Sequence, residues 1–229
     1  YTSAQGDAGV RAAIADYIRK THGVECDADY IYMTCGAAAS LTITLSALCN
    51  EGDEVITFAP YFTEYKVFAE TAGARLVALA SDPDTFQIDF SPLESALNEK
   101  TAAVLVNSPN NPSGVVYSEA TIQKLAALLE QKSAEYKKTI YLITDEPYRE
   151  LVYGGVKVPY LTKYYRNTFV CYSYSKSLSL PGERIGYIFV NPSAENAKQL
   201  YFAVCGAGRA LGYVCAPSLF QKMVARCQG

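Results

Sequence analysis

Short, uninterrupted apolar runs alternate with helical patterns along most of this 229-residue chain and limit the folds open to it. They predict strands at 31–34, 54–58, 75–80, 102–106, 139–144, 169–171 and 185–190. Helices are predicted at 7–20, 40–50, 65–71, 118–131 and from a capping box at Ser91. Continuously apolar strands are typical of a sheet covered by helices on both faces. The pattern therefore predicts an α/β fold, a three-layer α/β/α domain with a mostly parallel central sheet.

Composition and charge argue against several classes of function. Half of the residues are hydrophobic and 19% are charged, which suits a sizeable core rather than disorder. The net charge of −3 argues against a nucleic-acid or anionic-membrane partner, and no apolar run approaches the length of about 18 residues that spans a membrane. The chain begins with tyrosine rather than methionine, so we expect it to be part of a longer protein.

The cysteines and the single histidine narrow the chemistry further. Seven scattered cysteines without a CxxC pair predict a reduced, cytoplasmic protein with neither a zinc site nor a disulfide framework. His22 is the only histidine, and we expect it at an exposed helix end. No metal site and no Ser-His-Asp triad is therefore predicted.

The residues that follow the predicted strands carry most of the polar and aromatic chemistry of the chain. An open α/β sheet binds ligands outside the carboxyl ends of its strands, so we expect these residues to line one pocket. In chain order they are Gly36-Ala37-Ala38, Pro60-Tyr61-Phe62, the run Asn107 to Pro112, Asp145-Glu146-Pro147-Tyr148 and the run Ser173 to Lys176.

Lys176 is the single amine in a run of small hydroxyl residues, SYSKSLS, between two apolar strands. Ser173 and Ser175 precede it, and Arg184 follows it. This arrangement suits a covalently held, anionic cofactor whose phosphate pairs with Arg184. A surface ion pair with Glu183 explains the arginine about equally well.

Each of the other strand ends admits a functional and a structural interpretation. Asp145 follows a strand that should be buried on both faces, so it either acts as a structural acceptor or holds a ring nitrogen protonated. The small residues 36–38 open a helix, where they suit either a phosphate or tight packing. Phe62 could stack on a planar ring or lie in the core. Asn111 and Tyr148 could donate to a ring oxygen or shape their turns.

Three motifs resemble those of fold type I pyridoxal 5'-phosphate (PLP) enzymes, specifically the aspartate aminotransferase family of class I and II aminotransferases. They stand in the family's order and spacing: PNNPSG at 109–114, TDEPY at 144–148 and SYSKSLSLPGERIGY at 173–187. The resemblance implies that Lys176 holds PLP as the internal aldimine and moves a proton between the substrate Cα and the cofactor. It also implies that Asp145 pairs with the pyridinium nitrogen and makes the ring an electron sink.

The resemblance also implies the remaining contacts with the cofactor. Tyr148 and Asn111 would bind the ring 3-oxygen, and Phe62 would stack on the ring where relatives often have tryptophan. Ala38 stands where relatives carry a polar side chain, so one phosphate contact is expected to be missing. The phosphate would be held by hydroxyl, guanidinium and helix N–H groups of Ser173, Ser175, Arg184, Gly36, Ala37 and Ala38.

The domain and partner predictions also come from this resemblance. Tyr1 resembles the tyrosine that reaches the phosphate of the partner subunit's cofactor, which implies a homodimer with shared active sites. Residues 1–229 are expected to form the PLP-binding large domain, with the family's small domain largely absent. The arginine that grips the substrate α-carboxylate would lie beyond residue 229. We therefore expect this chain alone to bind PLP and to transaminate poorly or not at all.

The implied reaction moves an amino group from an aspartate-like amino acid, alanine or an aromatic amino acid to a 2-oxo acid. Other functions stay open, because carbon–sulfur lyases, aminocyclopropane-carboxylate-synthase-like enzymes and cofactor domains of transcription regulators use the same lysine, aspartate and arginine. A non-catalytic PLP-binding fragment is a further alternative.

A different enzyme class shares one pair of residues with this chain. Tyr172 and Lys176 match the Tyr-x-x-x-Lys pair of short-chain dehydrogenases, in which the lysine lowers the tyrosine pKa. That pair lies on one helix face, whereas Lys176 follows a strand in a serine-rich loop, and no GxGxxG motif is present.

Overall fold

The structure, a computed structural model, describes residues 2–228, and within them one seven-stranded sheet forms the centre of the fold. Its strands are β1 (Ile31–Thr34), β2 (Glu54–Ala59), β3 (Arg75–Ala80), β4 (Thr101–Asn107), β5 (Tyr141–Asp145), β6 (Thr168–Ser173) and β7 (Gly186–Val190). They lie in the order β1-β7-β6-β5-β4-β2-β3. Strands β2 to β6 pair in parallel, whereas β7 is antiparallel to both β6 and β1. The predicted mostly parallel sheet is confirmed.

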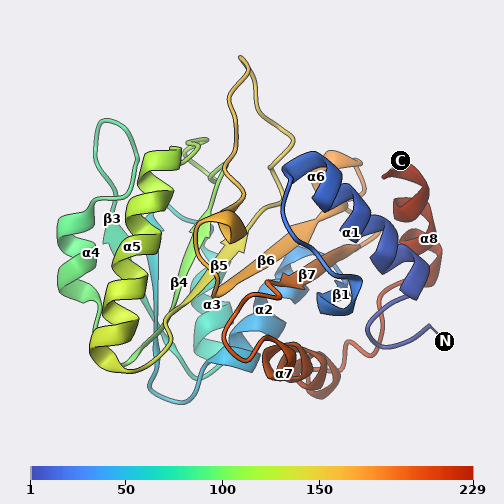
Figure 1. Cartoon of the computed structure of the whole chain (residues 1–229), viewed down its shortest axis with the longest axis horizontal. Coiled ribbons are helices and arrows are strands. Elements are labelled where there is room, and N and C mark those ends of the chain that lie inside the picture. Colours follow the sequence, from blue (N-terminus) through green and yellow to red (C-terminus); the bar gives the residue numbers. More distant parts are fainter. Residues whose placement is uncertain (1, 229) are drawn as a thin grey trace.

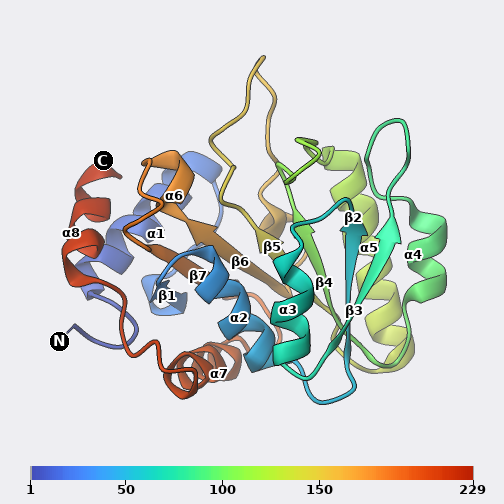
Figure 2. The same ribbon diagram turned by 180° about the vertical axis from the view of Figure 1, so that it is seen from behind.

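Helices cover both faces of the sheet and complete three layers (Figure 1, Figure 2). One face carries α1 (Ala8–His22), α4 (Phe90–Ala96), α5 (Glu119–Tyr136) and α8 (Ser218–Cys227). The other carries α2 (Ala37–Leu48) and α3 (Glu64–Thr71), with α7 (Ala197–Ala210) packed on α2. A four-residue helix, α6 (Tyr174–Ser177), directly follows β6. Within residues 2–228, no helix combines the length and apolar character that crossing a membrane needs.

Apolar side chains fill the space on both sides of the sheet. Val104 and Val106 of β4 pack against α5, whereas Ala103 and Leu105 point to the layer of α2 and α3. Every residue of β4 is buried. Both faces of the strand therefore need apolar side chains, which explains why its sequence is continuously apolar rather than alternating.

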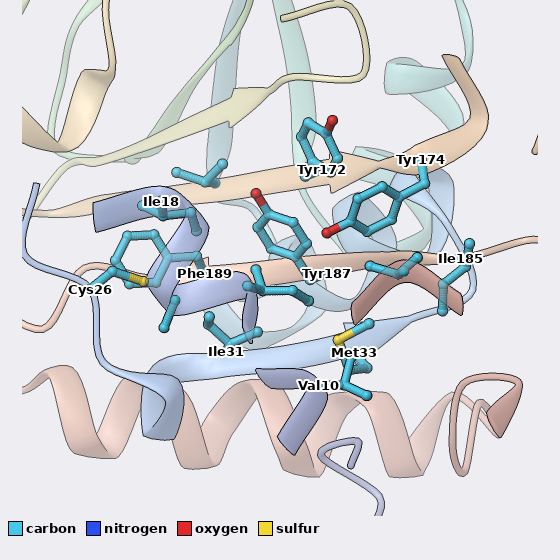
Figure 3. Packing of buried hydrophobic residues seen from close by; sticks show 14 of the residues in the cluster. Val10, Ile18, Cys26, Ile31, Met33, Tyr172, Tyr174, Ile185, Tyr187 and Phe189 are labelled. Atoms are coloured by element: carbon cyan, nitrogen blue, oxygen red, sulfur yellow. The ribbon is translucent and has the colours of Figure 1, made fainter. Parts of the chain in front are cut away.

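Aromatic packing supports the segment that carries Lys176. Figure 3 shows the buried cluster between α1 and the strands β1, β7 and β6, including Tyr172, Tyr174 and Tyr187. Tyr172 and Tyr187 stack with ring centroids 5.0 Å apart, and Tyr174 meets Tyr172 edge-on at 5.0 Å. These contacts anchor the end of β6 and the start of α6 on the core.

Several helix ends differ from the sequence predictions. Asp89, not Ser91, caps α4: its carboxylate accepts the Ser91 N–H at 3.0 Å, so the predicted capping box is wrong. Helix α2 begins at Ala37, three residues before the predicted start at residue 40, and Gly36 is its N-cap. Helix α5 continues to Tyr136 and ends where Lys137 adopts a left-handed conformation with φ of 51°.

His22 is half-buried rather than exposed at the end of α1. Its ring stacks on Tyr160, with centroids 4.5 Å apart, because the segment before residue 161 folds over the helix end. Burial, together with the nearby cations Arg149 and Lys163, lowers the pKa of His22 from 6.5 to about 4. The expectation of an exposed histidine is therefore wrong.

Candidate active site

The predicted residues come together where parallel strands end. Asn107, Asp145 and Ser173 are the last residues of β4, β5 and β6, and Asn107 and Asp145 are direct neighbours across their strands. Beside these ends lies a cavity of about 230 Å³. It is lined by Ala37, Ala38, Leu41, Phe62, Asn107, Asn111, Asp145, Pro147, Tyr148, Ser173, Ser175, Lys176, Pro181 and Arg184.

All of the predicted site residues that the structure describes, except Gly36, line this cavity. Gly36 is the N-cap of α2 and directly precedes the cavity residues Ala37 and Ala38. Tyr1 lies outside the described residues. Each of the five strand ends thus contributes to one cavity, while the individual roles of its residues stay predictions. The expectation that all the strand-end residues line it is wrong, because the following do not: Gly36, Pro60, Tyr61, Ser108, Pro109, Asn110, Pro112, Glu146 and Tyr174.

Asp145 is a buried carboxylate with one oxygen free. Only 5% of the residue is exposed, and its Oδ2 accepts a hydrogen bond from the Tyr65 hydroxyl at 2.6 Å. Its Oδ1 is buried without a hydrogen-bond partner in the described structure. Burial raises the pKa of Asp145 from 3.8 to about 7, opposed by the Tyr65 hydrogen bond and assisted by the neighbouring Glu146. An unpartnered oxygen of this kind is stabilised by a donor or cation entering the cavity.

Asn107 connects the ends of β4 and β5 with the turn that follows β4. Its Nδ2 donates to the main-chain oxygen of Asp145 at 2.8 Å, and its Oδ1 accepts the N–H of Asn111 at 2.6 Å. Burial and the charge of Asp145 raise the pKa of the Tyr148 hydroxyl. The Asn111 side chain lies beside this hydroxyl and lowers its pKa, but by less. Tyr148 therefore keeps its proton in the neutral range and can donate it in a hydrogen bond.

Lys176 lies on the short helix α6 rather than in the expected serine-rich loop. Ser173 caps this helix, because its hydroxyl accepts the N–H of Ser175 at 3.2 Å. The two serine hydroxyls are 2.8 Å apart. The Lys176 Nζ lies 5.8 Å from the centre of the Tyr148 ring, and the side chain is exposed. The amine is thus at the mouth of the cavity that it helps to line.

The N-terminus of α2 and Arg184 form a corner rich in hydrogen-bond donors. Gly36 has φ of 91°, and a Cβ at this position would lie 2.8 Å from the Arg184 guanidinium, so only glycine fits. The N–H groups of Ala37 and Ala38 belong to the first helical turn, which has no acceptors within the helix. Arg184 Nη1 also donates to Ser175 Oγ at 3.5 Å. Such a corner suits a phosphate.

Comparison with known proteins identifies the family that shares these features. Residues 1–225 match the family described as aminotransferase class I and II. The chain belongs to the class I and II aminotransferases. A probable aspartate/prephenate aminotransferase of Aquifex aeolicus is 32% identical over 193 residues, which cover 82% of this chain and 48% of that protein. The aspartate aminotransferase of Bacillus subtilis is 31% identical over 192 residues, covering 82% of this chain and 47% of its own.

Solved aminotransferase structures share the fold. A crystal structure of an aminotransferase from Eubacterium rectale superposes with a TM-score of 0.99 and 63% sequence identity, over 100% of this chain and 58% of that one. N-Succinyldiaminopimelate aminotransferase from Mycobacterium tuberculosis gives a TM-score of 0.90 at 28% identity, over 100% of this chain and 58% of its own. The chain therefore spans about half the length of these curated relatives and less than two thirds of these solved structures.

Two residues in and beside this cavity were not assigned a role from the sequence. Asn107 had a usable signal, because a polar residue at the end of a buried apolar strand needs partners. Tyr65 had no such signal in the sequence, because an aromatic residue on the inner face of an amphipathic helix is ordinarily part of the core. Its link to Asp145 depends on how α3 packs against β5.

The short-chain dehydrogenase alternative is wrong for this aminotransferase-family chain. Tyr172 lies on β6 and does not line the cavity with Lys176. Its hydroxyl donates to a Glu150 carboxylate oxygen at 2.9 Å and lies 2.8 Å from the Ser177 hydroxyl. Tyr172 thus supports the base of α6, and its pKa is raised by burial and by Glu150 rather than lowered by a lysine.

Proposed function

We propose that the complete protein is a PLP-dependent aminotransferase that transfers an amino group from an L-amino acid to a 2-oxo acid, with Lys176 as the lysine that binds PLP. The main supporting observation is the buried, unpartnered Oδ1 of Asp145, which belongs to the same cavity as the Lys176 amine. A basic ring nitrogen and an aldehyde on one small molecule would satisfy both groups.

The residues of the cavity fit the chemical groups of PLP. The free oxygen of Asp145 suits the ring nitrogen, and Tyr148 with Asn111 suits the ring oxygen. Phe62 offers an aromatic face to the ring. The phosphate would be held by donors that already lie together: the N–H groups at the start of α2 and the side chains of Ser173, Ser175 and Arg184.

Once bound, PLP supplies an electron sink for the bond that is broken at the substrate Cα. Asp145 would keep a proton on the ring nitrogen. The protonated ring nitrogen at Oδ1 would in turn stabilise the ionised carboxylate and offset the burial that raises the pKa of Asp145 to about 7. Tyr148 orients the ring by donating from its hydroxyl. The Lys176 Nζ, at the mouth of the cavity, would take a proton from the substrate Cα and deliver it to the cofactor.

The donor amino acids we expect are aspartate-like, aromatic or alanine. Relatives that carry the names aspartate aminotransferase and aspartate/prephenate aminotransferase support the first class. We expect the substrate α-carboxylate to be bound by an arginine outside residues 1–229, which then form the PLP-binding large domain. Residues 1–229 alone would bind PLP and transaminate poorly.

We further expect a cytoplasmic homodimer in which Tyr1 of each chain reaches the cofactor phosphate of the other. The sequence resemblance supports the dimer. All seven cysteines are unpaired in the described structure, which is consistent with a reducing compartment.

The test is an amino-donor screen of the complete protein with 2-oxoglutarate as acceptor and glutamate formation as the readout. We expect PLP-dependent glutamate formation that Lys176→Ala abolishes. Release of ammonia and a 2-oxo acid without an amino acceptor would indicate a carbon–sulfur lyase instead. PLP binding with neither product would indicate a non-catalytic binding protein, and a wild-type protein that binds no PLP would contradict the proposal entirely.

A further inference from the structure

We propose that Tyr65 is a positioning residue for the contact between Asp145 and the cofactor ring: it ties one carboxylate oxygen so that the other faces the cavity. The inference rests on the proposed function, because it assumes that PLP occupies the cavity. It assigns a role to a side chain that does not itself line the cavity.

The hydrogen bond between Tyr65 and Asp145 connects two residues that lie 80 positions apart in the chain. The Tyr65 side chain is almost fully buried, with 1% of the residue exposed, and its hydroxyl donates to Asp145 Oδ2 at 2.6 Å. This distance is typical of a hydroxyl that donates to an ionised carboxylate, one of the stronger classes of hydrogen bond. Burial and Asp145 raise the pKa of Tyr65 well above 10, so the hydroxyl keeps its proton at neutral pH.

The first turn of α3 fixes the place of this hydroxyl. The Tyr65 N–H donates to the Phe62 carbonyl at 3.0 Å, so the cavity residue Phe62 and the buried Tyr65 belong to the same turn. The Tyr65 ring is held edge-on to Phe62 at 5.6 Å and stacked on Tyr61 at 6.3 Å. Helix α3 therefore sets both the aromatic wall of the cavity and the orientation of the Asp145 carboxylate.

The backbone and the side chain of Asp145 have separate tethers. Asn107 Nδ2 binds the main-chain oxygen at 2.8 Å, and this bond leaves rotation of the carboxylate free. Among the residues that the structure describes, Tyr65 alone donates to the side chain of Asp145. Without the Tyr65 hydroxyl, neither carboxylate oxygen has a donor and the carboxylate has no fixed orientation.

The ionisable groups around Asp145 come from several elements and do not replace Tyr65. Glu146 directly follows β5 and opposes ionisation of Asp145. Cys171 is its neighbour on β6, with a thiol whose pKa burial raises, and Tyr148 lies on the following turn. The cations of the cavity, Lys176 and Arg184, form no ion pair with Asp145 in the described structure.

The experiment compares the affinity of the complete protein for PLP and for its 1-deaza analogue, in which a C–H group replaces the ring nitrogen. The variant is Tyr65→Phe. The control is Tyr165→Phe, which also removes a buried tyrosine hydroxyl, one that donates to the Ile140 carbonyl at 2.7 Å in a separate cluster. Both ligands carry the same aldehyde and phosphate, so only the contact between Asp145 and the ring nitrogen differs.

We expect Tyr65→Phe to weaken PLP binding about tenfold, equivalent to about 1.4 kcal/mol, and to change binding of the deaza analogue by less than about twofold. Tyr165→Phe should bind both ligands as wild type does. Equal weakening of both ligands would show a merely structural role and overturn the inference. Unchanged PLP affinity in Tyr65→Phe would overturn it too. A wild-type protein that binds neither ligand would instead contradict the proposed function.

A second comparison keeps the inference testable if Tyr65→Phe does not fold. Asp145→Asn removes the charge that would otherwise be left without a donor, so Tyr65→Phe is better tolerated in that background. We expect Asp145→Asn and the double variant Asp145→Asn/Tyr65→Phe to bind PLP equally, within about twofold. A further loss of about tenfold in the double variant would show that Tyr65 acts independently of Asp145 and would overturn the inference.

Discussion

The substitution Asp145→Asn should stabilise the PLP-free protein at alkaline pH, because it removes a carboxylate that is buried with one oxygen unpartnered. Burial raises the Asp145 pKa from 3.8 to about 7. Because the folded-state pKa is the higher one, the folded protein keeps this proton while the unfolded chain releases it, so stability falls as pH rises from about 4 to about 7. About three pKa units, at about 1.4 kcal/mol each, correspond to about 4 kcal/mol. Asparagine has a similar shape without the charge, so this loss disappears in the variant.

Urea denaturation of the PLP-free complete protein at about pH 5 and about pH 8 measures the effect. We expect the free energy of unfolding of Asp145→Asn to exceed that of wild type by about 4 kcal/mol at about pH 8 and by about 2 kcal/mol at about pH 5. Asp84→Asn, at an exposed position, is the control and should change either value by less than about 0.5 kcal/mol. An equal gain at both pH values, or a loss at about pH 8, would refute the reasoning. With saturating PLP, wild type should become more stable than Asp145→Asn. Wild type binds PLP more tightly through Asp145, and a ligand stabilises most the protein that binds it most tightly.

Two further substitutions test the framework of the site. Arg149→Leu leaves the buried Glu146 carboxylate without its partner at 2.5 Å, so urea denaturation should show a loss of about 3–5 kcal/mol. A loss below about 1 kcal/mol would contradict this. Gly186→Ala places a Cβ against a main-chain oxygen of β6 and 3.0 Å from Gly36 Cα, so it should cost about 1–3 kcal/mol of stability and weaken PLP binding. Gly206→Ala, with open space around it, should do neither.

The strand-end residues could be predicted from the sequence because their position follows from local patterns. A run such as 102–106 is apolar on both faces, so it must lie in the middle of a covered sheet, and the first polar residue after it marks the carboxyl end. The ends of parallel strands meet at one edge. Asp145 and Asn107 were therefore expected at the same edge of the sheet, and the pairing of β4 with β5 makes them direct neighbours.

Some features depend on a choice between two equally suitable residues, or on packing between segments far apart in the sequence, and these could not be predicted in this way. Asp89 and Ser91 are both good helix caps, and only the path of the chain decides that Asp89 is used. The antiparallel direction of β7 has no signal in a continuously apolar run. Tyr65 reads as a core residue on a helix, and its hydrogen bond to Asp145 exists only because α3 packs beside the end of β5.

The most direct test of the account is the chemical labelling of Lys176. The complete protein is incubated with PLP and reduced with borohydride, and its peptides are identified by mass spectrometry. We expect the pyridoxyl mass on the peptide that contains Lys176 and no label in Lys176→Ala. An unmodified Lys176 in protein treated with excess PLP, or a label confined to other lysines, would contradict the central claim that this amine binds the cofactor.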